Sequence, residues 1–431
     1  MQMITGKVQR LMVPSEKIGK TIQINGCVHK TRKMSGFTFI ILRTASELVQ
    51  CIYDGDNTPI EGVWVKIMGI VKADERSQRG YEILVTEIDL LSTPNELLPI
   101  TLSKKELGLT LGKNLDNRIF SLRHPKERAI FKVQQVILQG FRNFLETNSF
   151  TEIKSPKLVS GSAEGGANVF KLDYFGKEAL LAQSPQFYKE IMVGVFERVF
   201  EVGPVFRAEK HDTSRHINEY TSLDIEMGFI ESFYDIIELE TALLKHLFGF
   251  VIAKCEKELL LLGVVLEEFE DIPVITFNEA KKILKSIAPD EELGIKDLIP
   301  NEEKLLWAYV KEKYGSDFVF ITHYPTEKRP FYTMDSPGNE MVTESFDLLY
   351  KGLEITTGGQ RIHDYDTIVS KIRVLGMNPE DFKSFTVLHK YGIPPHGGFG
   401  LGLERLTARI LNIENIKQAC LFPRDINRLI P

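Results

Sequence analysis

The stretch from Arg198 to Ile230 constrains the fold of this chain more than any other. Its sequence, RVFEVGPVFRAEKHDTSRHINEYTSLDIEMGFI, contains two strand-like runs joined by a polar loop of about ten residues. Side chains alternate between the two faces of a strand, so each run has one apolar face and one charged face. The charged faces and the loop carry these side chains: Glu201, Arg207, Glu209, Lys210, Arg215, His216, Ser222, Asp224 and Glu226. The stretch therefore predicts a hairpin that forms one wall of a polar pocket.

The residue types of this hairpin suit an anionic ligand, with or without a metal ion, because charges of both signs share one face. Residue types alone leave a solvated hairpin with ordinary surface charges open. FRAE, a short loop, an Arg-His pair and a strand ending in DIEMGF resemble motif 2 (about residues 198–229) of the class II aminoacyl-tRNA synthetases, in the aspartyl/asparaginyl branch. The resemblance implies that Arg207 holds the α-phosphate of ATP and that Arg215 and His216 reach the other phosphates. A guanidinium binds phosphate oxygens in pairs and stabilises charge that develops in a transition state.

The length of 431 residues favours two or three domains, and the 43% hydrophobic and 26% charged residues are those of an ordinary globular protein. The net charge of −6 does not by itself indicate a nucleic-acid binder, although a local basic patch is enough to hold tRNA. The four cysteines form no CxxC pair, so we expect no zinc site, no disulfide framework and a cytoplasmic location. The start lacks the apolar core of a signal peptide, and the most apolar run, Leu259 to Val265, is too short to span a bilayer, so no membrane association is expected.

Residues 1–103 contain five strand-like runs separated by Gly, Asp and charged turns. Five short strands in about ninety residues suit an OB-fold barrel that binds single-stranded nucleic acid, but composition leaves a barrel for a protein partner equally open. The patterns G-x-V-x-x-x-R, F-x-x-L-R and V-Q resemble the anticodon-binding domain of the same synthetase branch. By that resemblance Phe39 stacks on an anticodon base, Gln50 contacts a base edge and Arg32 lies near the RNA backbone. For Phe39, a place in the barrel core is the alternative.

Residues 104–125 are expected to form a hinge, and residues 126–431 the catalytic domain of the family. Apolar residues at helical spacing between Lys126 and Asn148, followed by FTEIKSPKL, resemble motif 1 (about 136–160), through which the family forms homodimers. A helix that faces the core of its own chain is the alternative. Residues 231–328 show helical patterning and no motif. The predicted fold is α+β, with an N-terminal OB-fold barrel and a class II antiparallel-sheet domain with flanking helices.

Three further segments resemble the aspartate pocket of the family. SGSAEGGANVF, from Ser160 to Phe170, resembles a mobile loop whose glutamate senses the bound amino acid. Gln186 and Lys189 in QSPQ-x-x-K would lie on one side of a helix, although such a pair alone is most often surface decoration. Arg361 matches the arginine that pairs with the side-chain carboxylate of the substrate. The residues expected to contact aspartate are Glu164, Gln186, Lys189, Arg207, Asp224, Thr357 and Arg361.

The segment GLEITTGGQR supplies Glu354 and Thr357, oxygen ligands of the kind that Mg²⁺ prefers when ATP phosphates also hold it. The family has a serine where this chain has Thr357, which keeps the hydroxyl. GGFGLGLERLTARIL (397–411) resembles motif 3, and its Arg405 is expected to contact the adenine and the γ-phosphate. The groups expected to act in catalysis are Arg207, Arg405 and Glu354, with Glu354 and Thr357 as metal ligands. The residues expected to bind ATP are Arg207, Glu209, Arg215, His216, Ile217, Glu354, Gly402, Leu403, Glu404 and Arg405.

All three class motifs occur in order, so the resemblance covers essentially the whole chain and implies an aspartate–tRNA ligase of the archaeal type. Such an enzyme uses ATP and Mg²⁺ to convert L-aspartate into aspartyl-adenylate and then transfers the aspartyl group to tRNA. Three alternatives stay open: an asparaginyl-tRNA synthetase, a paralogue that makes free asparagine, and a catalytically silent RNA-binding protein on the same fold. Two cations, Lys189 and Arg361, favour a substrate side chain with a full negative charge.

The anticodon-binding segment also predicts which tRNA is charged. Family members that accept only tRNA(Asp) have a tryptophan in the first strand and a lysine just before G-x-E-I, and those positions hold His29 and Gln78 here. A base-edge contact discriminates by about 1–3 kcal/mol, so its loss brings tRNA(Asp) and tRNA(Asn) close to parity. We therefore expect both tRNAs to be aspartylated, with an amidotransferase acting downstream, unless Arg76 or Arg79 restores discrimination. The residues expected to contact the anticodon are His29, Arg32, Phe39, Gln50 and Gln78.

Overall fold

The computed structural model describes residues 17–77, 80–92, 94–161 and 168–431. The chain divides into two compact units, Met1–Pro125 and Lys126–Pro431, which are called the barrel unit and the sheet unit below. Among the described residues, no helix has the length and the apolar character that a membrane crossing requires.

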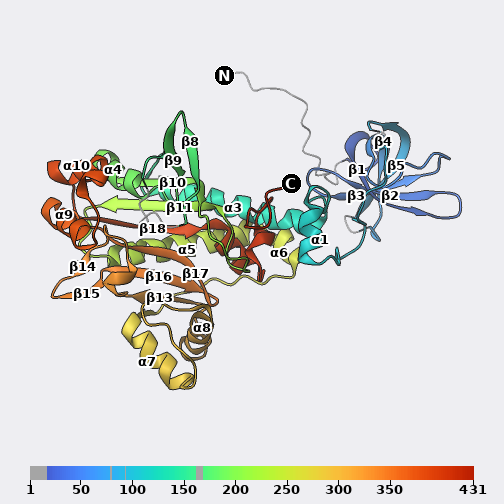
Figure 1. Cartoon of the computed structure of the whole chain (residues 1–431). Helices are drawn as coiled ribbons and strands as arrows, with labels where there is room; N and C mark the ends of the chain where they lie inside the picture. Colours follow the sequence, from blue (N-terminus) through green and yellow to red (C-terminus); the bar gives the residue numbers. More distant parts are fainter. Residues whose placement is uncertain (1–16, 78–79, 93, 162–167) are drawn as a thin grey trace. The chain divides into compact units, whose positions relative to one another are not determined.

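The described strands of the barrel unit close into one barrel with the order β1-β2-β3-β5-β4 (Figure 1). Alternate residues such as Ile40 and Leu42 of β2 point inward and are fully buried, so each strand contributes one face to an aliphatic core. This closed five-strand barrel confirms the OB-fold prediction. The strands are β1 (Thr21–Lys33), β2 (Thr38–Arg43), β3 (Leu48–Tyr53), β4 (Trp64–Ala73) and β5 (Tyr81–Leu90).

The barrel unit also contains two short helices, α1 (Leu111–Asp116) and α2 (Arg118–Ser121). They lie within the segment predicted as a hinge. The side chain of Thr110 accepts a hydrogen bond from the N–H of Lys113 and so caps the start of α1.

A large sheet organises the other unit, and its described strands have the order β12-β13-β16-β17-β18-β11-β10-β6. Strands β10 and β11 pair antiparallel from Arg198 opposite Met227 to Phe206 opposite Glu219, which confirms the predicted hairpin. In Figure 1 these two strands run beside β18, which pairs with β11 and brings the glycine-rich motif next to the hairpin. The strands are β6 (Thr151–Glu152), β10 (Arg198–Phe206), β11 (Glu219–Gly228), β12 (Val274–Thr276), β13 (Phe318–Thr322), β16 (Ser345–Tyr350), β17 (Leu353–Gln360) and β18 (His396–Gly402).

Helices α3 (Pro125–Thr147), α5 (Tyr234–Lys254) and α11 (Leu403–Ile410) share one hydrophobic core with the sheet. The predicted apolar stripe of α3 faces this core: Ile137 and Phe141 are fully buried, and the ring of Phe141 packs edge-on against Phe200 at 5.8 Å. Burial within one chain accounts for the stripe, so the stripe does not indicate a dimer. The expectation of a dimer rested on the resemblance to motif 1, because helical spacing alone does not distinguish a core from an interface.

The segment 231–328 contains the predicted helices and also two strands that were not predicted, β12 and β13. Helices α7 (Phe277–Ile287) and α8 (Pro300–Tyr314) pack with β13 around a small core of their own. Short apolar runs such as FVFIT are ambiguous between a buried strand and a buried helix, which is why the strands were missed. The other helices of the unit are α4 (Gln186–Phe196), α6 (Glu256–Leu262), α9 (Tyr365–Val374) and α10 (Lys383–Tyr391).

Two smaller sheets complete the described strands. One has the order β7-β9-β8 and the other pairs β14 with β15. Their bounds are β7 (Leu158–Val159), β8 (Lys171–Tyr174), β9 (Lys177–Leu181), β14 (Asp335–Ser336) and β15 (Asn339–Thr343). Short 3₁₀ turns lie at Thr326–Lys328, Pro379–Phe382 and Ile416–Ala419.

Candidate active site

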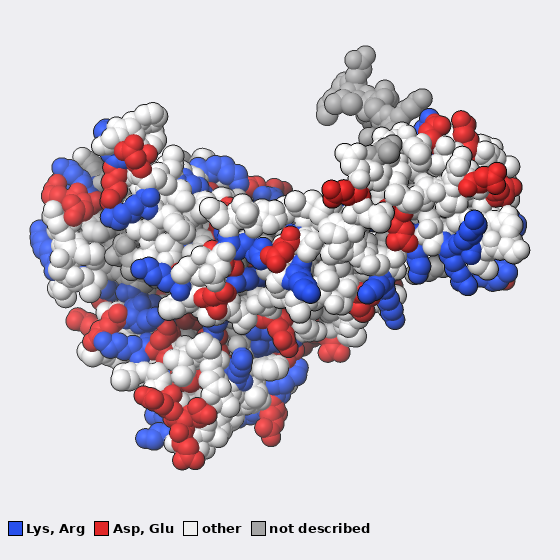
Figure 2. Space-filling view, turned by 45° about the vertical axis from the view of Figure 1, so that its right-hand side comes forward, with Lys and Arg blue, Asp and Glu red and all other residues white. Residues whose placement is uncertain are grey.

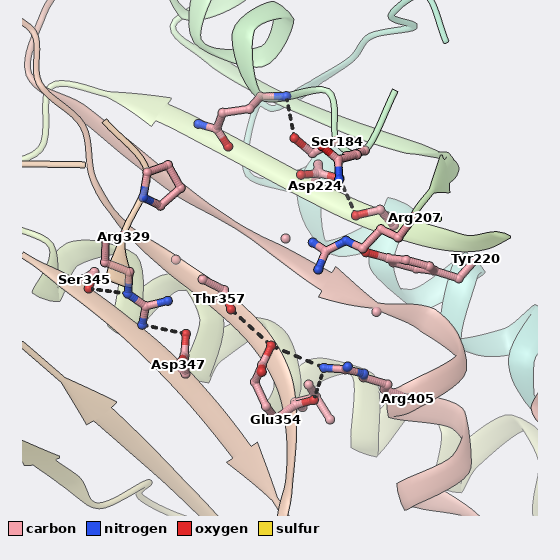
Figure 3. Close-up of a pocket in the computed structure, with 18 of the residues that line it drawn as sticks. Ser184, Arg207, Tyr220, Asp224, Arg329, Ser345, Asp347, Glu354, Thr357 and Arg405 are labelled. Atoms are coloured by element: carbon pink, nitrogen blue, oxygen red, sulfur yellow. Dashed lines mark hydrogen bonds and ion pairs between the residues drawn. The ribbon is translucent and has the colours of Figure 1, made fainter. Parts of the chain in front are cut away.

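A cavity of about 360 Å³ opens on the polar face of the large sheet. Its walls come from the loop between β10 and β11, from β11, β16, β17 and β18, from the start of α4, from α11 and from the loop 328–333, so segments far apart in the sequence meet in it. Figure 3 shows residues from opposite walls, including Arg207, Glu354 and Arg405, directed toward the same space. The predicted site residues that line it are Gln186, Lys189, Arg207, Glu209, Arg215, His216, Ile217, Asp224, Glu354, Thr357, Arg361, Gly402, Glu404 and Arg405.

Among the described residues, one that was predicted for this site, Leu403, is not in the cavity walls. The side chain of Leu403 lies in the hydrophobic core beneath the sheet, because the first turn of α11 directs it there. Its predicted contact with ATP is therefore not made by the side chain in this structure. Glu164 lies outside the described residues.

One end of the cavity holds four buried charges that form a closed network. Lys189 Nζ donates to Asp224 Oδ1 at 3.0 Å and to the carbonyl oxygen of Phe399 at 3.1 Å, and it lies 3.4 Å from Glu226 Oε2. Arg361 donates to Glu226 through Nε at 2.9 Å and Nη2 at 3.3 Å. Two carboxylates thus hold two cations in place, as buried ions require.

Glu226 is the residue of this network for which no role was predicted. Burial alone would raise the pKa of Glu226, but Arg361 and Lys189 hold it below its ordinary value. Its side chain is fully buried beneath the cavity, between the two cations. The alternation of β11 placed Glu226 on the same face as Asp224, and that was the only signal available.

Behind Lys189, a second buried group supports α4. Gln186 Nε2 donates to Glu190 Oε1 at 2.6 Å, and Glu190 Oε2 lies 3.1 Å from His396 Nε2. Burial would lower the pKa of His396, but the hydrogen bond to Glu190 raises it. Gln186 and Lys189 therefore lie on the inner side of α4, as predicted, and are not surface residues.

Glu354 and Arg405 mark the other end of the cavity. Arg405 Nη1 donates to the carbonyl oxygen of Glu354 at 2.9 Å and to its Oε1 at 3.3 Å, and Thr357 Oγ1 donates to the same Oε1 at 3.2 Å (Figure 3). Burial alone would raise the pKa of Glu354, but Arg405 and Arg215 hold it below its ordinary value. A carboxylate kept ionised among arginines suits a site for phosphate groups and a divalent cation.

Asp347 is a second carboxylate at this end that sequence reasoning missed. It lies opposite Thr357 in the β16–β17 pairing and lines the cavity. Arg329 Nη2 donates to Asp347 Oδ1 at 2.8 Å, and burial raises the pKa of Asp347 to about 6 although Arg329 opposes the rise. The acid in SFDLLY, next to a strand that bears Glu354, was the signal that could have found it.

The loop between β10 and β11 brings more cations to the same end. The guanidinium of Arg207 lies over the ring of Tyr220 at 5.9 Å. His216 Nε2 lies 3.5 Å from Glu209 Oε2, and burial lowers the pKa of His216. Both oxygens of Glu404 accept from the backbone N–H of Thr221, at 3.2 and 3.1 Å, so its side chain anchors β11 as well as lining the cavity.

The glycines of β18 let this strand pass close to the charged network. A Cβ on Gly398 would lie 2.0 Å from the carbonyl oxygen of Ile225, and a Cβ on Gly400 would lie 3.2 Å from Asp224 Oδ1. Any larger residue at Gly398 would push β18 away from β11. Gly400 and Gly402 also line the cavity, so the backbone forms part of its floor.

Four of the predicted anticodon residues, His29, Arg32, Phe39 and Gln50, lie on β1–β3 of the barrel unit. Phe39 is opposite Arg32 in the β1–β2 pairing and packs edge-on against Phe37 at 5.0 Å. Its neighbours Ile40 and Leu42 belong to the barrel core, whereas Phe39 does not, so the core alternative for Phe39 is wrong. Gln50 Nε2 donates to Glu82 Oε2 at 3.2 Å, and the sequence had not indicated Glu82.

His29 is almost fully buried, and burial lowers its pKa to about 4, so its imidazole is neutral at pH 7. It lines a second cavity, within the barrel unit, together with Arg43. Gln78 lies outside the described residues. Figure 2 shows acidic and basic side chains intermixed on the face in view, as the small net charge leads us to expect.

Known proteins are similar to this chain over nearly its whole length. The family model of tRNA synthetases class II (D, K and N) matches residues 111–426. Aspartate–tRNA(Asp/Asn) ligase of Deinococcus radiodurans is 45% identical over 419 residues, 96% of each chain. Aspartate–tRNA(Asp) ligase of Pyrococcus abyssi is 38% identical over 97% of this chain and 98% of its own.

Solved structures give the same result. Asparaginyl-tRNA synthetase from Pyrococcus horikoshii, complexed with asparaginyl-adenylate, has a TM-score of 0.88 at 31% identity and covers 96% of this chain and 97% of its own. Aspartyl-tRNA synthetase from Entamoeba histolytica has a TM-score of 0.83 at 31% identity, with coverage of 97% and 91%. The family model over residues 111–426 and these similarities lead to one conclusion: the chain belongs to the class II tRNA synthetases of the D, K and N type.

Proposed function

We propose that this chain is an aspartate–tRNA ligase, which activates L-aspartate with ATP and transfers it to tRNA. The observation that carries the proposal is the buried network of Lys189, Arg361, Asp224 and Glu226 at one end of a cavity whose other end holds Arg207 and Arg405. The first end suits a small amino acid with a charged side chain. The second suits the phosphates of a nucleotide.

Aspartate is favoured over asparagine by the charge of this network. Lys189 and Arg361 are both fixed on the cavity wall by hydrogen bonds, so a ligand carboxylate would meet two cations that need no rearrangement. An amide would have to present its NH₂ or oxygen to two groups that only donate. The ligases at 37–45% identity are named for aspartate, which agrees with this reasoning. Asparaginyl-tRNA synthetase remains the second candidate, because enzymes with that activity are close structural neighbours.

The activation step needs placement and charge stabilisation more than it needs a covalent group. In our proposal the α-carboxylate of aspartate attacks the α-phosphorus of ATP in line, the mixed anhydride aspartyl-adenylate forms, and the bond to pyrophosphate breaks. Arg207 neutralises charge on the α-phosphate as it builds up, and Arg405 holds the far end of the nucleotide. A hydroxyl of the terminal ribose of the tRNA then attacks the aspartyl carbonyl carbon, an ester to the tRNA forms, and AMP leaves.

The residues at the phosphate end fit a magnesium ion that ATP carries in with it. Asp347, Glu354 and the hydroxyl of Thr357 offer hard oxygens on adjacent strands. Within the described residues no cluster of three or more His, Cys, Asp or Glu side chains could hold a metal alone, which agrees with a cation held partly by phosphates. When bound there, Mg²⁺ would offset phosphate charge.

The tRNA specificity and the quaternary structure belong to the same proposal. Arg32, Phe39 and Gln50 lie on the face of β1–β3 where single-stranded bases could stack and be read. His29 stands where strictly selective relatives have tryptophan, so we propose that both tRNA(Asp) and tRNA(Asn) are aspartylated, with an amidotransferase downstream.

We also propose a homodimer. Sedimentation velocity at micromolar concentration would show one species near twice the 49.1 kDa chain mass, and a monomer would contradict it.

Amino-acid-dependent exchange between ATP and radiolabelled pyrophosphate tests the activation step without tRNA. We expect exchange with L-aspartate and essentially none with L-asparagine. Exchange with asparagine alone would support the second candidate. No exchange with either amino acid would indicate a silent RNA-binding protein on this fold.

A further inference from the structure

The side chain of Glu303 connects the helical segment between β11 and β16 to the phosphate end of the cavity. It lies in the first turn of α8 and is buried. Arg215 Nη2 donates to its two oxygens at 2.7 and 2.9 Å, and the backbone N–H of Glu354 donates to Oε2 at 3.1 Å. One carboxylate therefore binds a side chain of the motif 2 loop and the backbone of β17.

The fold fixes the position of Glu303 independently of these contacts. The neighbouring Glu302 accepts from Lys281 Nζ at 2.6 Å and from the N–H of Ile299 at 2.7 Å, which secures the start of α8. The turn between β16 and β17 packs directly on the helix, since a Cβ on Gly352 would lie 3.0 Å from Lys304 Cα. Glu303 is thus held rigidly and can fix the position of Arg215.

The bonds to Glu303 leave most of the Arg215 guanidinium for a ligand. Both use Nη2 alone, and Arg215 lines the cavity. A second guanidinium, that of Arg409, is close enough for Arg215 to lower its pKa, after the larger effect of burial. Without the negative charge of Glu303, repulsion between these two arginines would move Arg215 away from its place at the cavity.

We propose that Glu303 is a positioning residue for ATP, which holds Arg215 at the cavity edge and steadies the backbone of Glu354 beside it. The inference rests on the proposed function and adds to it a role for the segment 231–328, in which the sequence shows no motif. The alternative is that the pair only joins α8 to the sheet. The positioning role and the structural role predict different results. Loss of a purely structural pair should not raise the KM for ATP more than the KM for aspartate.

Two adjacent glutamates give a matched comparison. Glu303→Gln keeps the size and an acceptor for the N–H of Glu354 but removes the charge that holds Arg215. Glu302→Gln makes the same change at a buried glutamate that bonds only to Lys281 and Ile299 among the described residues. Aspartate-dependent ATP–pyrophosphate exchange would be measured for both variants, together with thermal unfolding, Arg215→Ala and the Arg215→Ala/Glu303→Gln double variant.

We expect Glu303→Gln to raise the KM for ATP and for pyrophosphate about tenfold or more, which corresponds to about 1.4 kcal/mol. The KM for aspartate of Glu303→Gln should stay within about twofold of that of the unmodified enzyme. Glu302→Gln should lower the melting temperature without raising the KM for ATP more than the KM for aspartate. Because Glu303 acts through Arg215, the double variant should be no worse than Arg215→Ala alone. Glu303→Asp, which keeps the charge, should recover part of the ATP affinity. Glu303→Met, which also removes the charge, replaces Glu303→Gln in the comparison if that variant does not fold.

An unchanged KM for ATP in a folded Glu303→Gln or Glu303→Met variant would overturn the proposal. An equal rise in the KM for aspartate would also overturn it, as would a double variant whose loss is the product of the two single losses. Absence of aspartate-dependent exchange in the unmodified enzyme would instead contradict the proposed function, so the two failures are distinguishable.

Discussion

Replacing Arg361 by leucine should abolish aspartate activation and leave ATP binding almost unchanged. Arg361 makes three hydrogen bonds at the closed end of the cavity, to Glu226 Oε1 at 2.9 Å, to Glu226 Oε2 at 3.3 Å and to the carbonyl oxygen of Gly398 at 2.9 Å. Leucine removes all three and leaves the buried Glu226 with Lys189 as its remaining partner in the network. Removing one partner of a buried ion pair costs about 3–5 kcal/mol. The same change deletes a cation that the aspartate side chain would meet.

At about 1.4 kcal/mol for each factor of ten, this cost corresponds to a fall of two to three orders of magnitude in kcat/KM for aspartate. The assay is ATP–pyrophosphate exchange at varied aspartate, with ATP affinity measured separately by equilibrium dialysis. Arg142→Leu is a control for the loss of an arginine–glutamate pair elsewhere, since Arg142 of α3 donates two bonds to Glu152 of β6, both at 3.2 Å, in a partly exposed pair away from the cavity walls. Aspartate-dependent exchange within about tenfold of the unmodified enzyme, in a folded Arg361→Leu variant, would refute the assignment of this pocket.

Two more residues give testable predictions. Burial raises the pKa of Glu240 to about 8. Between about pH 4.5 and this value the folded chain keeps a proton that the unfolded chain releases. The free energy of unfolding should therefore fall as the pH rises through this range. Glu240→Gln should remove this dependence of stability on pH, which is worth up to about 5 kcal/mol. The substitution should raise the melting temperature more at pH 8 than at pH 5. An equal rise at both pH values would contradict the role of Glu240. Asp347→Asn keeps an acceptor for Arg329 but loses the charge, so half-maximal exchange should need about tenfold more Mg²⁺. An unchanged magnesium titration would remove Asp347 from the metal site.

The hairpin was predictable because strand alternation and a distinctive order of residues both point to it. Arg207, Asp224 and the Arg215–His216 pair reach one cavity because β10 and β11 pair in register, as a hairpin with a long tip requires. Their spacing placed Gln186 and Lys189 on one side of a helix, and the resemblance of QSPQ-x-x-K to the aspartate pocket of the family indicated that this side faces the site.

Other features depended on contacts that local sequence does not determine. Glu303 lies 88 residues from Arg215 in a segment without a motif, so nothing local indicated that they meet. Glu226 is buried beneath the cavity, where its function is to hold two cations that come from other elements. The stripe on α3 was visible in the sequence, but only the packed structure shows that it faces the core of its own chain.

Charging of tRNA(Asp) and tRNA(Asn) transcripts, each with aspartate and with asparagine, tests the central claim most directly. We expect aspartate on both tRNAs with kcat/KM values within about tenfold of each other, because His29 replaces the tryptophan of selective relatives and a base contact is worth about 1–3 kcal/mol. We expect no asparagine on either tRNA, because Lys189 and Arg361 favour a carboxylate. A preference for tRNA(Asp) above about a hundredfold, the size of a full base contact, would contradict the relaxed specificity. Asparagine attached to tRNA(Asn) would contradict the proposed function itself.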